Sequence, residues 1–475
     1  MPFLIPFYSV IFSFRLTSFV GPKKTATRNI QQFLGQNENA TKLLDEDNVK
    51  VYTRFNAVNN EIWDDVFQLL WRCKHNMSKT TLDDFMTTSC FDANVEPAWT
   101  RFQNEMKYQS DELGNSIFLS EENIYGCPGF EINVKRLADT FHLYSTNFKQ
   151  VNVVVTYRRY FEWILSLYNQ ENKLSHWRIE NVYSNEIFES NSFVNWYRNI
   201  APNTGISERE VVSESSVEFL RDTFSPQNVH VFNMHDESES SDNGIGNRQT
   251  EQRGGVVGRF ICTEIQQAKG LCTAIQSGEF PELEQVTNAR NGLLDSQYIV
   301  HRAIMDMMES TKRNSSNNNR TSERPFVWGG GKLPSNRQIN YAVLELAPQV
   351  EEFKQARVAQ NVTSDTGNTT DSANTKTSKD GIPLELLTSS ELDDILQRSI
   401  ELERFLVPEY HSSSNEDEGE TALRKIFQEF VNDQKFCSID YDRLMDEQQE
   451  WRRFVYELLY DYAQSHEGEG REPST

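Results

Sequence analysis

The segment from Gly21 to Arg28 has the side chains and the position of an anion-binding turn. It stands between an apolar run at 16–20, which predicts a buried strand, and a helical pattern at 29–34. The backbone N–H groups of such a turn and the dipole of the following helix both favour a negatively charged ligand. Its side-chain donors are Lys23, Lys24, Thr25, Thr27 and Arg28. Because charged and hydroxyl donors prefer phosphate-type oxygens, we predict that this turn binds a phosphate-like group.

The turn differs from the Walker loop of enzymes that transfer phosphoryl groups. Ala26 and Thr27 stand where the Gly-Lys of a Walker loop would be, so the hydroxyl that binds magnesium is not indicated. No aspartate that would hold magnesium follows an apolar strand. The early lysine and the missing magnesium ligands favour transfer of a group other than phosphoryl, and we expect no metal. A phosphotransferase of the P-loop kinase type is the alternative.

A second set of basic and hydroxyl residues follows the most apolar run of the chain. The run at 151–156 leads into Tyr157, Arg158 and Arg159, and a helical pattern follows. Ser166 lies eight positions after Arg158, about two helical turns further on. An arginine fork and a hydroxyl suit a second phosphate, held apart from the first. The alternative is an arginine at the sheet edge beside an ordinary surface serine.

Charge and cysteine content limit the classes of function. The net charge of −23 over 475 residues argues against nonspecific binding to nucleic acid or to anionic lipid. In so acidic a chain, the basic residues of the 21–28 turn indicate a local anion site. The six cysteines are too scattered for a zinc motif or a disulfide scaffold. Cys262 and Cys272 are the closest pair, and their pairing or their burial as free thiols both stay open.

Short apolar runs alternate with helical patterns through the first half of the chain. The candidate strands are 16–20, 49–53, 117–120, 151–156 and 229–232, and the amphipathic stretches include 61–73, 95–108 and 130–144. This alternation predicts an α/β fold with an open, mostly parallel sheet flanked by helices. Ligands bind at the carboxyl ends of the strands in such sheets, which is where the 21–28 turn and Arg158 are expected.

The remaining segments complete the expected organisation. An apolar extension at 1–14 precedes an α/β core at 15–235 and a polar insertion at 236–253. A helical continuation of the same domain at 254–465 carries polar, disordered insertions near 314–335 and 361–380, and a polar tail closes the chain at 466–475. Within the continuation, helices are expected at 283–309, 339–358, 391–405, 422–431 and 451–463. The glycine-rich run 254–258, beside Arg259, is expected to be a loop.

The two anion-binding motifs together resemble the sulfotransferases that use 3′-phosphoadenosine 5′-phosphosulfate (PAPS). The turn is similar to the family form Gly-Pro-His-Lys-Thr-Gly/Ala-Thr, with Lys23 in place of the histidine and Ala26 in place of a common glycine. The run from Ile117 to Glu122 is similar to the strand-ending Ser-Ser-Glu of carbohydrate sulfotransferases. The resemblance covers about residues 15–235 and implies a P-loop-like sheet.

The resemblance also implies a role for each motif. The turn would hold the 5′-phosphosulfate through Gly21, Pro22, Lys23, Lys24, Thr25, Ala26, Thr27 and Arg28. Arg158 and Ser166 would hold the 3′-phosphate. Lys24 would contact the bridging oxygen on which charge develops as the sulfuryl group leaves. The general base would be Glu122 or, as an alternative, His235, although a surface carboxylate and a structural histidine are also common at such positions.

The substrate and the compartment follow from the same resemblance. The implied acceptor is a hydroxyl or an amine, most readily on a carbohydrate, and the implied compartment is the Golgi lumen. The apolar residues 1–14 lack a basic flank and are shorter than a membrane span, so membrane contact would come only through an N-terminal anchor. Glycosylation sequons are present, although chance alone accounts for about their number. A cytoplasmic location and a noncatalytic nucleotide- or glycan-binding protein are the alternatives.

Overall fold

The computed structural model describes residues 14–20, 27–53, 62, 96–120, 148–183, 185–200, 214–235, 254–284, 293–316, 333–362, 382–407 and 416–465. The chain forms two compact units. The first comprises residues 1–163, 205–287 and 397–420, and the second comprises residues 164–204, 288–396 and 421–475. Each unit draws on three separate stretches, so neither is a continuous piece of the sequence.

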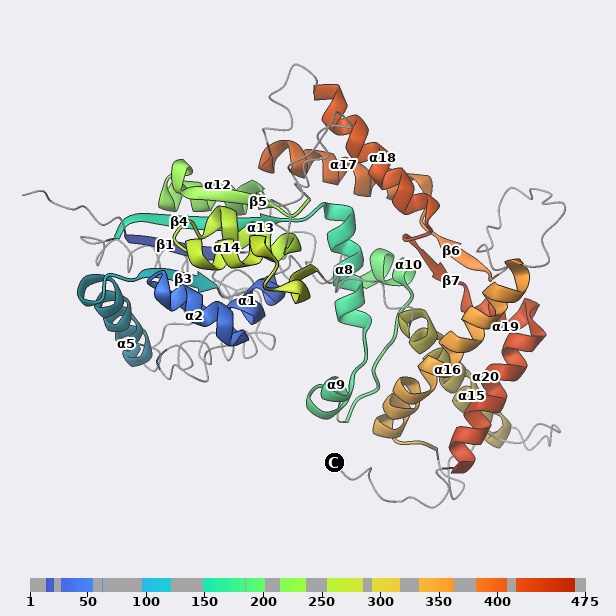
Figure 1. The fold of residues 1–475 in the computed structure, drawn as a ribbon. Helices are drawn as coiled ribbons and strands as arrows, with labels where there is room; N and C mark the ends of the chain where they lie inside the picture. The colour runs from blue at the N-terminus through green and yellow to red at the C-terminus, as the bar shows by residue number, and fades with distance from the viewer. Residues whose placement is uncertain are drawn as a thin grey trace, which may run out of the picture. The chain divides into compact units, whose positions relative to one another are not determined.

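A five-stranded parallel sheet forms the centre of the first unit (Figure 1). Its strands are β1 (Phe14–Val20), β2 (Val49–Thr53), β3 (Ser116–Ser120), β4 (Phe148–Tyr157) and β5 (Val229–Asn233). They are ordered β2-β3-β1-β4-β5, and every neighbouring pair runs parallel. The valines of β4 are buried, as expected for a parallel strand that is covered on both faces.

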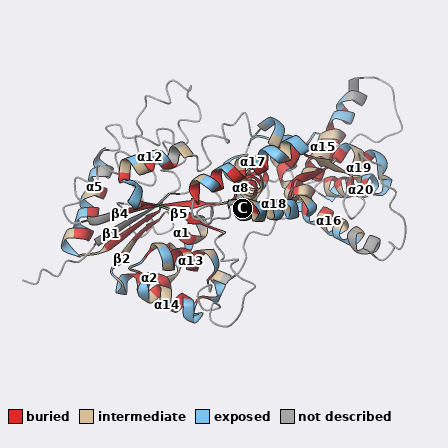
Figure 2. Ribbon diagram, turned by 90° about the horizontal axis from the view of Figure 1, so that it is seen from above, coloured by how far each residue is buried: buried red, intermediate tan, exposed pale blue. Residues whose placement is uncertain are grey.

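Helices cover both faces of this sheet (Figure 2). One face carries α1 (Thr27–Gln36), α2 (Glu38–Glu46), α13 (Gly255–Glu264) and α14 (Lys269–Ser277). Their apolar side chains share a core with Val51, Val154 and Phe232 of the sheet. The other face carries α12 (Glu214–Phe224) and α5 (Glu96–Lys107). Because successive residues of a strand point to opposite faces, Tyr52 meets Phe102 of α5 with ring centroids 6.2 Å apart.

Three short helical segments complete the described part of the first unit. They are η2 (Tyr108–Glu112), η4 (Pro226–Asn228) and η6 (Pro281–Glu284). The segment η2 continues α5 with wider turns before the chain enters β3.

The second unit is built mainly from helices. Its elements are α9 (His176–Asn181), α10 (Phe193–Asn195), η3 (Trp196–Ile200), α15 (Leu293–Ser316), α16 (Asn336–Val362), α19 (Tyr441–Glu447), α20 (Gln449–Ser465) and the antiparallel pair β6 (Leu384–Leu386) and β7 (Cys437–Ile439). Helices α8 (Tyr160–Asn172), α17 (Ser389–Leu406) and α18 (Glu416–Asn432) have residues in both units. The core of the second unit lies between α15, α16 and α20, where Phe353 stacks on Phe454 at 4.0 Å.

Most of the expected elements are confirmed. All five predicted strands form, and the helices expected at 95–108, 339–358, 391–405, 422–431 and 451–463 appear with bounds shifted by a few residues. Helix α15 begins at Leu293, later than expected, and runs to Ser316, into the segment expected to be a polar insertion. The stretches 63–73, 130–144 and 236–253, and most of 314–335 and 361–380, lie outside the described residues.

The loop expected at 254–258 is wrong. Gly254 and Gly255 have φ angles of +87° and +57°, and the chain then enters α13. A Cβ on Gly254 would lie 2.5 Å from Cγ2 of Ile275, so the absence of a side chain lets α13 approach α14 closely. A disulfide between Cys262 and Cys272 joins the same two helices. The two cysteines are therefore paired rather than buried as thiols, while Cys437 is buried and is not part of a disulfide.

Candidate functional site

The carboxyl ends of the five parallel strands share one edge of the sheet. Strand β1 lies between β3 and β4, and the chain leaves β1 toward β2 but leaves β4 toward β5, on the opposite side. The boundary between β1 and β4 is therefore the topological switch point, where open α/β sheets bind their ligands. The 21–28 turn follows β1, and Arg158 follows β4. In the sequence, the two motifs thus follow the two strands that border this point.

The described part of the 21–28 turn is its end, where α1 begins at Thr27. Gly21, Pro22, Lys23, Lys24, Thr25 and Ala26 lie outside the described residues, as does Glu122. Gln31, fully buried in α1, donates hydrogen bonds from Nε2 to the carbonyl and hydroxyl oxygens of Ser120, at 3.2 and 3.0 Å. The backbone carbonyl of Gln31 accepts a hydrogen bond of 3.4 Å from the hydroxyl of Thr53. These contacts fix the first turns of α1 against the carboxyl ends of β2 and β3.

A cluster of charged side chains lies at the carboxyl ends of β4 and β5. We call it the ion-pair cluster, and its members are Arg158, Arg159, Glu162, His235 and Glu403. Glu162 lies at its centre: its oxygens are 3.5 Å from Nε of Arg158 and 3.8 Å from Nη1 of Arg159. Nε2 of His235 is 3.6 Å from the same carboxylate. Glu403, from α17, brings Oε1 to 4.0 Å from Nε of Arg159.

Backbone hydrogen bonds hold this cluster in place. Nε2 of His235 accepts a hydrogen bond of 3.2 Å from the backbone N–H of Arg159, and the N–H of His235 donates to Oδ1 of Asn233 at 3.0 Å. Arg259 of α13 donates from Nη2 to the carbonyls of Asn233 and Met234, at 3.1 and 2.5 Å. Its guanidinium also lies 5.2 Å from the centroid of the Phe232 ring. The segments that follow β4 and β5 are therefore fixed relative to each other.

Burial controls the protonation of the cluster. Burial raises the pKa of Glu403 to about 7, against the opposing effect of the Arg159 charge. Burial also raises the pKa of Glu162, although the neighbouring guanidinium groups lower it in part. Burial and the adjacent arginines hold the pKa of His235 well below its usual range, so this imidazole is neutral at neutral pH. The cluster thus combines fixed positive charge with carboxyl groups that protonate easily.

The structure brings two of the predicted residues together. Arg158 and His235 belong to the same cluster, which the sequence did not indicate. Ser166 lies half-buried on α8 and belongs to the second unit, whereas Arg158 belongs to the first. Thr27 and Arg28 occupy the first turn of α1.

Four charged residues of this region were missed by sequence reasoning. Arg159 and Glu162 had a usable signal, since positions three and four apart face each other on a helix. Glu403 and Arg259 come from distant segments, and no local pattern links them to Arg158. Among the described residues, no group of three or more histidine, cysteine, aspartate or glutamate side chains is placed to hold a metal ion.

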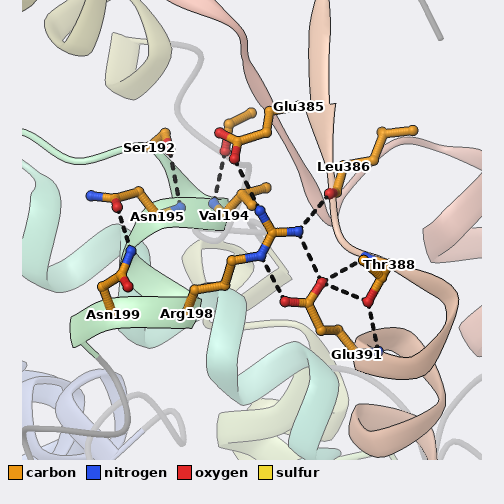
Figure 3. A network of polar contacts seen from close by, with 10 residues as sticks. Ser192, Val194, Asn195, Arg198, Asn199, Glu385, Leu386, Thr388 and Glu391 are labelled. Carbon is orange, nitrogen blue, oxygen red and sulfur yellow. Dashed lines mark hydrogen bonds and ion pairs between the residues drawn. The ribbon is translucent and has the colours of Figure 1, made fainter. Parts of the chain in front are cut away.

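A second polar network lies within the second unit (Figure 3). Arg198 donates to both carboxylate oxygens of Glu391, at 2.7 and 3.0 Å, and to Glu385 at 3.1 Å. Glu391 accepts hydrogen bonds from the N–H and hydroxyl of Thr388, whose hydroxyl accepts from the N–H of Glu391. Reciprocal bonds of this kind form a capping box at the start of α17. The network therefore has a structural explanation.

The chain was compared with known families and structures. No family model, curated protein or solved structure matches it. In the part of the chain that the structure describes, no helix is both long and apolar enough to cross a bilayer. The sheet edge and the ion-pair cluster are the features of this chain that bear on its function.

Proposed function

We propose that this chain is a PAPS-dependent sulfotransferase with a P-loop-like core. The observation that carries the proposal is that β1 and β4, the strands that the two motifs follow in the sequence, are neighbours in a parallel sheet ordered β2-β3-β1-β4-β5. The basic turn follows β1, Arg158 follows β4, and the two strands are neighbours at the switch point. Two anion-binding elements beside a switch point suit a ligand with two separated phosphate groups.

The proposed roles follow from the chemistry of sulfuryl transfer. An acceptor oxygen or nitrogen attacks sulfur while the bond between sulfur and the bridging oxygen breaks, and negative charge accumulates on that oxygen. The ammonium of Lys24, aided by backbone donors of the turn, would stabilise this charge without a metal. Arg158 would hold the 3′-phosphate, a role that the sequence also gives to Ser166. The P-loop kinase alternative gains no support, since it needs the missing Walker ending.

The choice of general base is narrowed by the contacts of His235. Its Nε2 lone pair accepts the backbone N–H of Arg159, so this nitrogen is already occupied. In the sequence, Glu122 follows Ser120 by two residues, and Ser120 is the last residue of β3, which pairs with β1. We therefore favour Glu122 as the group that removes the proton from the acceptor.

The Cys262–Cys272 disulfide supports the proposed compartment. Disulfides persist in oxidising compartments such as the secretory pathway and are rare in the cytosol. A lumenal enzyme that transfers sulfuryl groups to carbohydrate hydroxyls is consistent with this bond. The carbohydrate acceptor itself rests on the resemblance of the 117–122 segment.

Calorimetric titration of the full chain with adenosine 3′,5′-bisphosphate tests the proposal. We expect binding of the bisphosphate in preference to ATP, without added magnesium. Lys24→Ala should keep most of this affinity and lose sulfuryl transfer from PAPS, because its contact strengthens in the transition state. Arg158→Ala should weaken binding about 10- to 100-fold, since a charge-assisted hydrogen bond is lost. Preference for ATP would favour the kinase alternative, and binding without any turnover would favour a noncatalytic protein.

A further inference from the structure

The ion pairs of the cluster are long. The four contacts that link Arg158, Arg159, His235 and the two carboxylates measure between 3.5 and 4.0 Å. Charge-assisted hydrogen bonds are typically about 2.7–2.9 Å long. The Glu162 carboxylate therefore faces two guanidinium groups, and neither of the two contacts is a short hydrogen bond. An oxyanion that approaches these guanidinium groups more closely would compete with this carboxylate.

Of the buried polar atoms in this region that make no hydrogen bond to the described residues, three belong to Glu403 and its neighbours. They are the Tyr157 hydroxyl, Nε of Arg159 and Oε2 of Glu403. The side chain of Glu403 is only 6% exposed and that of Arg159 only 10% exposed. Buried polar groups are nearly always hydrogen-bonded, so a set of this kind points to a site that completes its bonding in another state.

Each element packed around Glu403 contributes a group to its electrostatic environment. Strand β4 and its end supply Tyr157 and Arg159, and α8 supplies Glu162. Through Glu162 the cluster extends to Arg158 and to His235, beside which lies Arg259 of α13. The pKa of the Tyr157 hydroxyl is raised well above its usual range, and that of His235 is lowered. Neither of these two groups exchanges a proton near neutral pH in the free protein.

We propose that an oxyanion binds to the guanidinium groups of Arg158 and Arg159 together with one proton, which the carboxyl group of Glu403 takes up from solvent. This inference rests on the proposed function, since the oxyanion is the phosphate held after β4. It adds a regulatory property to that site: the affinity of the site depends on pH.

The coupling follows from the charges. An oxyanion beside Arg159 would add negative charge close to Glu162 and Glu403, which already flank this arginine. Protonation of one carboxyl group removes that repulsion. Glu403 is the group that protonates, because burial already raises its pKa to about 7 and a bound anion would raise it further. The dissociation constant should therefore be nearly constant below pH 7 and rise up to tenfold per pH unit above it.

The experiment is calorimetric titration of the full chain with adenosine 3′,5′-bisphosphate at pH 7.5, 8.0 and 8.5. At each pH, two buffers with different ionisation enthalpies report the number of protons taken up. The phosphate groups of the ligand are then almost fully ionised, since their second pKa is about 6. We expect uptake approaching one proton and a dissociation constant that rises about tenfold between pH 7.5 and 8.5.

Glu403→Gln carries a neutral side chain at every pH. It should bind without proton uptake, with a dissociation constant that is independent of pH over this range and about thirtyfold lower than that of the unmodified chain at pH 8.5. Glu401→Gln is the matched control, because Glu401 lies on the same helix but is exposed. This control should keep the proton uptake.

The outcomes separate the two proposals. Binding without proton uptake by the unmodified chain would overturn this inference and leave the proposed function standing. Proton uptake that persists in Glu403→Gln would also overturn it. No binding at any pH would refute the proposed function, and the inference with it. The measurement on the unmodified chain decides the matter even if the variant does not fold.

Discussion

The backbone N–H of Arg159 donates a hydrogen bond to Nε2 of His235 over 3.2 Å. This bond fixes the proton of the neutral imidazole on Nδ1, since Nε2 acts as the acceptor. It also joins the segment that follows β4 to the segment that follows β5. A single side chain thereby sets the separation of two segments whose charged groups form the ion-pair cluster.

Substitution of His235 tests this hydrogen bond. His235→Ala leaves the N–H of Arg159 without its acceptor in a buried setting, and we expect the free energy of unfolding to fall by about 1–3 kcal/mol. His235→Gln is the matched control, because its carbonyl oxygen can reach the place of Nε2. Urea unfolding measures both variants. Equal losses in the two would show that the hydrogen bond is not the stabilising contact.

Glu403 makes stability depend on pH. Its pKa is about 7 in the folded protein, against an ordinary value of 4.5, so the folded state holds a proton that the unfolded chain has released between these values. The stabilisation is fully present below pH 4.5 and is lost as the pH rises to about 7, by about 1.4 kcal/mol per pH unit.

Urea unfolding of the unmodified chain and of Glu403→Gln at pH 5, 6, 7 and 8 measures this dependence of stability on pH. The difference in unfolding free energy between the two chains should shift in favour of the variant as the pH rises to 7. Above pH 7 the difference should be constant. A difference that does not change between pH 5 and 7 would contradict the raised pKa. Glu401→Gln should behave like the unmodified chain.

The disulfide should stabilise the helical layer formed by α13 and α14. The double variant with serine at Cys262 and Cys272 should lose about 2–3 kcal/mol of unfolding free energy, because the bond closes a short loop with a sequence separation of 10. Thermal unfolding measures the loss, and peptide mapping under nonreducing conditions checks the pairing. Recovery of both cysteines as free thiols from the native protein would contradict the bond.

The capping box at the start of α17 gives a prediction for the second unit. Thr388→Ala removes the hydroxyl that caps the helix, and we expect a loss of about 1 kcal/mol, whereas Thr388→Ser should lose less. Hydrogen bonds from Arg198 and Thr388 lower the pKa of Glu391 to about 2. The stabilisation from Glu391 is therefore present above pH 4.5 and is lost as the pH falls toward 2. Thermal melts of both variants at pH 7 and 3 measure these effects.

Much of the first unit could be predicted from the sequence, because its signals are local. The β-branched run in β4, and the strand and helix on either side of residues 21–26, need only neighbouring residues to be interpreted. The loop predicted at 254–258 failed for a tertiary reason: glycine there permits contact with Ile275, and the chain continues as a helix. Local composition favours a loop, and packing overrides it.

Only part of the candidate site could be predicted from the sequence, because local patterns do not show how distant segments pack. Arg158 and His235 follow apolar strands, so their place at the sheet edge can be inferred from order alone. The identity of their partners depends on how distant helices pack. Glu403 reaches Arg159 from α17, and Arg259 reaches Met234 from α13. The protonation behaviour of the site, which depends on burial, was therefore outside the reach of sequence patterns.

The central position of β1 has a consequence for synthesis on the ribosome. Its partner β3 emerges before β4, so one edge of β1 stays unpaired while the next segment is translated. Unpaired strand edges readily associate with other chains. The helical layer that contains α2 and α14 is completed even later. Its contacts include a hydrogen bond from the backbone N–H of Gly270 to the carboxylate of Asp47, two residues that are 223 positions apart in the sequence. Folding of this unit therefore cannot finish until most of its residues have been translated. The unpaired edge of β1 is open to association with other chains until β4 has been made.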